Sequence, residues 1–299
     1  MTTQSWSTPI DHSSDAGFRT GGAELKSKFL AAGLVQAPDT GQIDWTTVTR
    51  AAANTDAGYE IYYLNDSLFG TAPIYLKIFY GTGSTTSLPR LRLQIGTGTN
   101  GAGTLTGLTN TALQISMTSG ALSSTTNSYQ SFLCVTAGFI GLIWKAGNVQ
   151  GVTGVAVGGF CLCRSCDSSG AISATGAFMY ACSVQNSTSA VATNQSMRFA
   201  STAIAYASTT NHAASVPGAE TSSTIGTDTQ AFLFWMLTKQ VAPVFGMAVA
   251  YLTEISEAST FSATLVGTTS HTYIQTARRL GTGWNADNNA LQGMCMLWE

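Results

Sequence analysis

Hydrophobic residues recur at helical spacing only near the start of the chain. Between residues 11 and 33 the apolar positions are separated by seven, four and three residues: Phe18, Leu25, Phe29 and Ala32. Serine and aspartate residues before this run are candidate N-caps, and Gly33 is a typical helix stop. The pattern predicts a helix within residues 13–33, which Gly21 and Gly22 each weaken by about 1 kcal/mol relative to alanine.

From Tyr59 onward the pattern changes to short runs of β-branched and aromatic residues, separated by clusters of Gly, Ser, Thr and Asn. In PRLRLQI, residues 89–95, leucine and isoleucine alternate with arginine and glutamine, which is typical of a strand with one buried face. No later segment of helical length is amphipathic. The sequence therefore predicts a mainly β protein: an antiparallel β-sandwich or jelly-roll-like body over residues 58–299, after a short N-terminal helical arm over residues 1–57. One sandwich unit or two packed units both fit this length.

The most apolar stretch, residues 231–252, is interrupted by Lys239, Gln240 and Pro243. It is therefore interpreted as two buried strands, and no membrane insertion is expected. The first fifteen residues have neither a basic nor an apolar region, so they do not resemble a signal peptide.

The amino-acid composition excludes some classes of function and favours others. Only 9% of the 299 residues are charged and the net charge is −2, so we expect no nucleic-acid partner. Serine and threonine together number 74, and glycine 31. The abundant aromatic residues argue against disorder. A surface of hydroxyl groups with so few charges favours a protein that is buried against many copies of itself.

Three cysteines form a C-x-C-x-x-C pattern: Cys161, Cys163 and Cys166. A structural zinc site needs four ligands, and the fourth would have to be distant in the sequence. On a strand, Cys161 and Cys163 point to one face, and Phe160 and Leu162 point to the other. The pattern therefore favours buried thiols on a strand over a metal or redox site.

The segment GTGTNGAG, residues 96–103, matches the glycine spacing of dinucleotide-binding loops at Gly96, Gly98 and Gly101. Such a loop needs a following helix and an acidic residue about 20 positions later. The next residues are rich in Thr and Gly, and no Asp or Glu occurs from Ser67 to Cys166. We therefore expect no nucleotide and no other cofactor.

Candidate catalytic residues are few. Glu254 and Glu257 could form a carboxylate pair of the kind that cleaves glycosidic bonds, but two solvated charges in a loop are the favoured interpretation. The three histidines, His12, His212 and His271, are scattered, and neither G-x-S-x-G nor H-E-x-x-H occurs. The sequence therefore predicts a protein that is not an enzyme.

A resemblance to a known class emerges from several segments together. WSTPIDHSSDAGFRTGGAELKSKFLAAGLVQAPDTGQIDWTTV, followed by AGYEIYYLNDSLFGTAPIYLKIFYGTG and LRLQIGTGTNGAG, resembles virion structural proteins of tailed bacteriophages. SFLCVTAGFIGLIWKAG and GGFCLCRSCDSSGAISATGAF fit the same type. The resemblance implies a multi-copy component of the tail, baseplate, fibre or capsid surface, assembled in the host cytoplasm and located in the virion. Its expected partners are further copies of itself and other virion proteins.

Two alternatives remain open: a module that binds a receptor or host-surface glycan, and a glycan-degrading tailspike. In the favoured interpretation, the apolar residues of the arm are too few to form a core alone. We therefore expect them to dock on another subunit or another virion protein, with Trp45 as the best single anchor. These anchor residues are Trp6, Ile10, Phe18, Leu25, Phe29, Leu34 and Trp45.

Overall fold

The computed structural model describes most of the N-terminal half of the chain and the strands of the C-terminal half. The described residues are 2–83, 89–108, 112–115, 126–146, 156–164, 171–174, 176, 178–185, 196–200, 222–225, 229–235, 243–251, 259–263, 270–279 and 292–299. The described part is mainly β, and every strand pairing in it is antiparallel, as predicted from the sequence.

The predicted helix is present as α1 (Asp15–Ala32). The side chain of Ser14 caps its start and accepts a hydrogen bond from the Gly17 N–H at 3.0 Å. Gly33 ends the helix with φ 105°, a left-handed conformation that glycine adopts without steric cost. Both ends were therefore predicted correctly from local residue preferences.

The first sheet has five strands in the order β2-β3-β4-β5-β8. They are β2 (Leu34–Gln36), β3 (Asp56–Leu64), β4 (Tyr75–Thr82), β5 (Pro89–Gly96) and β8 (Leu113–Gln114). A small two-stranded sheet, β6 (Gly98–Thr99) with β7 (Leu105–Thr106), follows β5.

The second sheet is the central one and has six strands, in the order β1-β9-β10-β11-β12-β13. They are β1 (Thr3–Asp11), β9 (Thr126–Thr136), β10 (Phe139–Ala146), β11 (Ala156–Arg164), β12 (Phe178–Gln185) and β13 (Ser196–Ala200). β1 comes from the N-terminus and forms one edge of this sheet, next to β9.

The third sheet contains the C-terminal strands in the order β14-β15-β16-β19-β18-β17. They are β14 (Ser222–Ile225), β15 (Thr229–Trp235), β16 (Pro243–Tyr251), β17 (Thr260–Ala263), β18 (His271–Arg279) and β19 (Gln292–Leu297). β19 lies inside the sheet, between β16 and β18.

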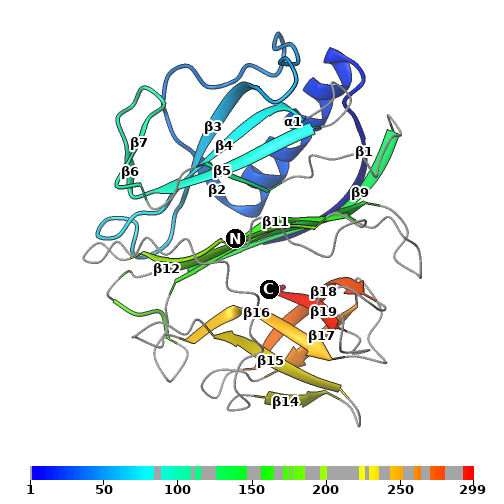
Figure 1. The fold of residues 1–299 in the computed structure, drawn as a ribbon. Coiled ribbons are helices and arrows are strands. Elements are labelled where there is room, and N and C mark those ends of the chain that lie inside the picture. Colours follow the sequence, from blue (N-terminus) through cyan, green and yellow to red (C-terminus); the bar gives the residue numbers. More distant parts are fainter. Residues whose placement is uncertain are drawn as a thin grey trace.

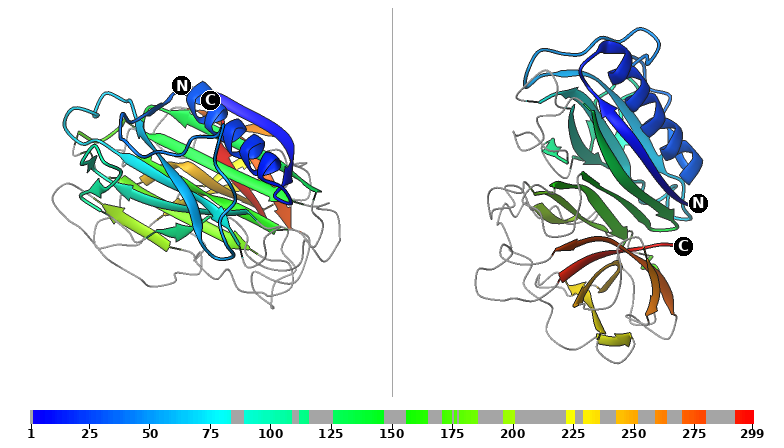
Figure 2. Two further views of the ribbon diagram at one scale, coloured as in Figure 1. Left: turned by 90° about the horizontal axis from the view of Figure 1, so that it is seen from above. Right: turned by 90° about the vertical axis from the view of Figure 1, so that its right-hand side faces the viewer.

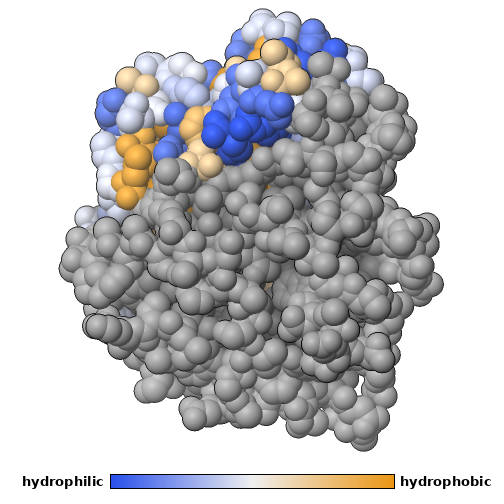
Figure 3. All heavy atoms as spheres, viewed as in Figure 1, coloured by the Kyte–Doolittle hydropathy of each residue, from blue (hydrophilic) through white to orange (hydrophobic). Residues whose placement is uncertain are grey.

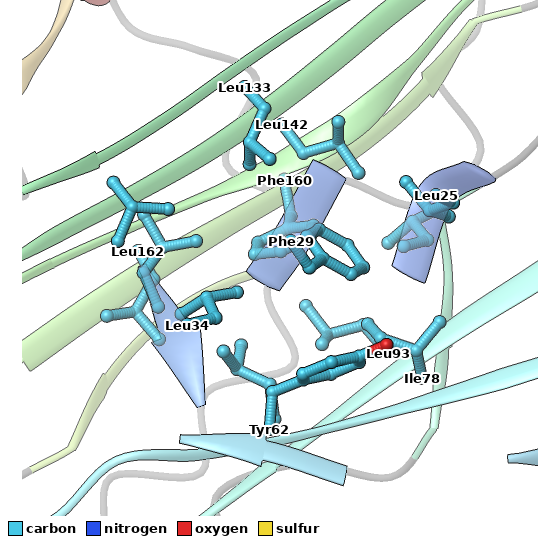
Figure 4. Close-up of a cluster of buried hydrophobic side chains, with 14 of the residues drawn as sticks. Leu25, Phe29, Leu34, Tyr62, Ile78, Leu93, Leu133, Leu142, Phe160 and Leu162 are labelled. Carbon is cyan, nitrogen blue, oxygen red and sulfur yellow. The ribbon is translucent and has the colours of Figure 1, made fainter. Parts of the chain in front are cut away.

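The three large sheets are stacked, with the central sheet in the middle (Figure 1). α1 lies between the five-stranded sheet and the central sheet, and runs beside β1 along one side of the molecule (Figure 2). Side chains from both sheets and from α1 form the main core (Figure 4). Phe29 of α1 lies among them and is 1% exposed.

The central sheet is buried on both faces. Leu133, Leu142 and Leu162 face the main core. The alternate positions face the C-terminal sheet, where the Phe132 ring meets Trp298 edge-on and Gly141 lies against Met296. Strands covered on both faces have nearly continuous apolar sequences, which explains runs such as SFLCV in β9 and FIGLIW in β10.

Candidate functional site

Most of the predicted anchor residues lie inside the chain's own core. Phe18, Leu25, Phe29, Leu34 and Trp45 are all buried in the cluster that joins α1 to the two neighbouring sheets. Trp6 of β1 is partly buried and packs against the same cluster, while the side chain of Ile10 lies outside the described residues.

The expectation that these five buried residues dock on another subunit is therefore wrong. The physical reason is that residues 1–57 do not have to form a core alone. β1 pairs with β9, which is more than a hundred residues away, and α1 covers the gap between two sheets. Any contact between copies must use other side chains.

The position of the Trp45 ring depends on a glycine of α1, Gly22. Its indole packs edge-on against Phe18, with ring centroids 5.4 Å apart, and against Tyr80 at 4.8 Å. A Cβ atom built on Gly22 would lie only 2.0 Å from the Trp45 ring. Gly22, which weakens the helix as a local residue, is thus required by the close approach of Trp45 to α1.

Beneath Trp45 lies a fully buried carboxylate, Glu60 of β3, which is 0% exposed. Its Oε1 accepts a hydrogen bond from Trp45 Nε1 at 3.1 Å and lies 3.2 Å from Lys26 Nζ of α1. Its Oε2 accepts hydrogen bonds from the hydroxyls of Tyr62 at 2.7 Å and Tyr80 at 2.8 Å. Four donors from α1, β3, β4 and the 37–55 connection therefore converge on one carboxylate, which we call the Glu60 network.

Burial raises the pKa of the Tyr62 hydroxyl, and the neighbouring Glu60 charge raises it further. The pKa of Tyr80 is raised by burial first, and then by Tyr62 and Glu60. Both hydroxyls therefore remain protonated and keep donating to the carboxylate. Sequence reasoning missed this network, although Glu60 shares a strand face with the apolar positions Tyr62 and Leu64. A lone charge on an apolar strand face was the available signal.

A second buried ion pair joins the five-stranded sheet to the central sheet. Arg164 at the end of β11 is 0% exposed and Asp66, after β3, is 1% exposed. The guanidinium also donates to the backbone oxygens of Ala72 at 2.8 Å and Gly176 at 3.2 Å. With its donors shared among these acceptors, Arg164 serves as a structural link between the two sheets.

The outer face of the five-stranded sheet, away from α1, carries charged side chains from β3, β4 and β5, and hydrophilic residues form a patch on this part of the molecule (Figure 3). Lys77 Nζ lies 3.8 Å from the ring centroid of Tyr59 and 4.6 Å from that of Phe79. Arg92 pairs with Asp56, and Arg90 lies 3.6 Å from the same carboxylate. Lys77 and Arg92 are thus partly buried against aromatic rings, since Arg92 also lies 4.9 Å from the ring centroid of Phe79.

The glycine-rich segment GTGTNGAG contains β6 and the turn of the β6–β7 hairpin, and it covers part of this outer face. The Asn100 side chain accepts hydrogen bonds from the backbone N–H groups of Ala102 and Thr104, which holds the tip of the hairpin. Asp39 accepts from the Gly103 N–H at 3.0 Å. β7 follows the loop where a dinucleotide fold would begin a helix, so the geometry does not match that fold.

Cys161 and Cys163 are each 2% exposed on β11, on the face opposite to Phe160 and Leu162, as the strand interpretation predicts. Cys134 on β9 lies in the same row of the sheet as Cys161, with Gly141 between them. Among the described residues, no cluster of histidine, cysteine and acidic side chains has the arrangement of a metal site. Cys166 lies outside the described residues.

Of the remaining candidates, the structure describes His12 and His271, which belong to different parts of the fold. His12 is buried beside Phe18 and lies 3.3 Å from the Thr82 hydroxyl. His271 Nδ1 lies 2.9 Å from Glu299 Oε1, on the C-terminal sheet. His212, Glu254 and Glu257 fall outside the described residues. No described helix is long and apolar enough to cross a membrane.

The exposed side chains have a shared chemical character. Among the residues whose exposure the structure describes, the exposed ones are almost all Ser, Thr, Ala, Gly and Asn, with Asp44 and Glu299 as the charged ones. The side chain of Asp15 is also 42% exposed. On α1 the most exposed residues are uncharged, namely Ala16, Thr20, Ala23, Ser27, Leu30 and Ala31, and the charged residues Arg19, Glu24, Lys26 and Lys28 are partly buried. Several charged residues lie instead in partly or fully buried pairs, such as Lys26–Glu60 and Arg164–Asp66.

Comparison with protein-family models, with curated proteins and with solved structures finds no match to this chain. The functional argument therefore depends on the surface and the buried networks of the chain itself.

Proposed function

We propose that the chain is a multi-copy structural component of a bacteriophage particle, in the tail, baseplate, fibre or capsid surface. It assembles through contacts between identical copies and with other virion proteins. The resemblance of its segments to virion proteins of tailed phages suggests the particle, and the surface chemistry suggests the mode of assembly. In this proposal the chain has no catalytic activity, and its location is the virion after assembly in the host cytoplasm.

The observation that carries the proposal is the scarcity of charge: 9% of the residues are charged, and few charged residues are among the exposed ones whose side chains the structure describes. A monomeric protein usually keeps roughly a quarter to a third of its surface charged, which prevents association. Methyl groups, and hydroxyl groups that form hydrogen bonds across the contact, can be buried against a similar surface without bringing an unpaired charge into it. A neutral surface of small side chains therefore favours self-association.

Electron microscopy of the purified full-length chain, over a range of concentrations, tests this proposal. We expect regular closed or repeating assemblies that persist when salt is raised, because contacts without ion pairs are not screened. Single isolated chains at every concentration would contradict the proposal. Assemblies that dissolve in high salt would contradict the argument from the neutral surface.

A glycan-binding module on the same particle is the second candidate, and one cluster favours it. Tyr63, Phe69 and Tyr75 lie together on the outer face of the five-stranded sheet, with ring centroids 4.5 to 6.1 Å apart, and all three are partly exposed. Aromatic rings are apolar platforms with polar tips, which suits contact with a sugar ring. Binding to an array of neutral oligosaccharides that Phe69→Ala abolishes would support this candidate, and an array without signal would remove it.

A further inference from the structure

The Glu60 network contains the two reactants of an amide bond. The Lys26 ammonium and the Glu60 carboxylate approach to 3.2 Å between Nζ and Oε1. The carboxylate is completely buried, while the Lys26 side chain is 29% exposed. We propose that Lys26 and Glu60 condense into a covalent side-chain amide that fastens α1 to β3.

The hydrogen bonds to the carboxylate suit the transition state of this condensation. When Nζ attacks Cδ of Glu60, negative charge develops on the oxygen that stays attached. Oε2 already accepts from Tyr62 and Tyr80 at 2.7 and 2.8 Å, so two fixed hydroxyl donors are directed at that oxygen. Donors placed in this way around a buried carboxylate stabilise a developing oxyanion.

The other oxygen, Oε1, is placed to leave. One proton moves from the Lys26 ammonium to Oε1, which gives a neutral amine and a neutral acid. The lone pair of Nζ then forms the N–Cδ bond, and a second Nζ proton passes to the Oε1 hydroxyl. The Cδ–Oε1 bond breaks and water departs, while Trp45 Nε1–H, 3.1 Å from Oε1, stabilises the departing oxygen. The amide keeps the third Nζ proton, so the step needs no oxidant or co-reactant.

Two physical terms favour the product. Groups held side by side in one molecule gain from proximity, and for well-oriented reactants the effective concentration reaches about 10⁵ M or more. The product is also neutral, so it removes the desolvation cost of two charges in and beside the core. The exposed part of Lys26 marks the side on which the released water leaves, since Glu60 has no exposed surface.

The test is the mass of the purified full-length chain under denaturing conditions. We expect the wild-type chain to be lighter than its sequence by one water molecule. Peptide mapping should show one branched fragment that joins the Lys26 and Glu60 peptides, without cleavage by trypsin after Lys26. The matched control is Lys26→Arg, which keeps the positive charge but replaces the amine with a guanidinium that stays protonated. Its mass should equal the mass of its sequence.

A wild-type chain at its full sequence mass overturns the proposal, and so does a missing water that maps to other residues. The wild-type measurement decides the question even if Lys26→Arg fails to fold. The result is also independent of assembly, because the bond lies within one chain and does not require the particle proposed above.

Discussion

The two adjacent glycines of α1 should respond in opposite directions to the same substitution. Gly21→Ala and Gly22→Ala add the same methyl group to neighbouring positions of one helix. At Gly21 the new Cβ has no atom within 4 Å, whereas at Gly22 it would lie 2.0, 2.1 and 2.4 Å from three atoms of the Trp45 ring. Helix propensity alone makes either change stabilising by about 1 kcal/mol.

At Gly22 two losses oppose this gain. The buried Trp45 ring must move away from α1, and overpacking of a close-packed core costs about 1–3 kcal/mol. As long as Glu60 is a free carboxylate, a displaced ring also weakens the hydrogen bond from Trp45 Nε1 to it, and bonds to charged groups contribute about 1.5–3 kcal/mol. We therefore expect Gly22→Ala to lower the free energy of unfolding by about 2–4 kcal/mol, and Gly21→Ala to raise it by up to about 1 kcal/mol.

Urea denaturation followed by tryptophan fluorescence measures both changes. Gly21→Ala is the matched control, since it changes helix propensity without touching Trp45. If both variants are stabilised to the same extent, Trp45 does not pack on Gly22 and the description of this part of the core is wrong.

Three further predictions concern the buried groups and the absence of catalysis. Arg164→Met should lower the free energy of unfolding by about 3–5 kcal/mol in urea, because it leaves the Asp66 carboxylate buried without its partner, and adding Asp66→Asn should restore part of the loss. Burial raises the pKa of Cys134 to about 11. The stability that this thiol contributes is therefore complete below the ordinary thiol pKa of 9.0 and is lost as pH rises through 11. The urea midpoint should fall less steeply with rising pH in Cys134→Ala than in the wild type. Purified chain should cleave no glycan, and the double variant Glu254→Gln/Glu257→Gln should assemble like the wild type; glycan cleavage that this variant loses would favour the tailspike instead.

The features that depend on neighbouring residues were predictable from the sequence. The ends of α1 follow from Ser14 and Gly33, and the alternation in PRLRLQI places Leu93 and Ile95 in the core, both 0% exposed. The same-face spacing of Cys161 and Cys163 also follows from the two-residue period of a strand.

The features that depend on distant partners were not predictable. β1 has the sequence TQSWSTPID, which is rich in turn-forming residues, and it is a strand because it pairs with β9. Trp45 was expected at an interface because local patterns do not reveal that Gly22 provides space for its ring inside the same chain. The ion pair of Glu60 was likewise not predictable, because Lys26 reaches it only through the packing of α1. Sequence periodicity indicates which face is buried, but not which element covers it.

The neutral surface is the part of the molecule on which the functional proposal depends, and native mass spectrometry of the full-length chain tests it most directly. We expect a discrete series of species whose masses are whole multiples of the chain, with the largest species dominant as concentration rises and with little change when volatile salt is increased. A single species at the mass of one chain, at all concentrations, would contradict assembly through identical copies.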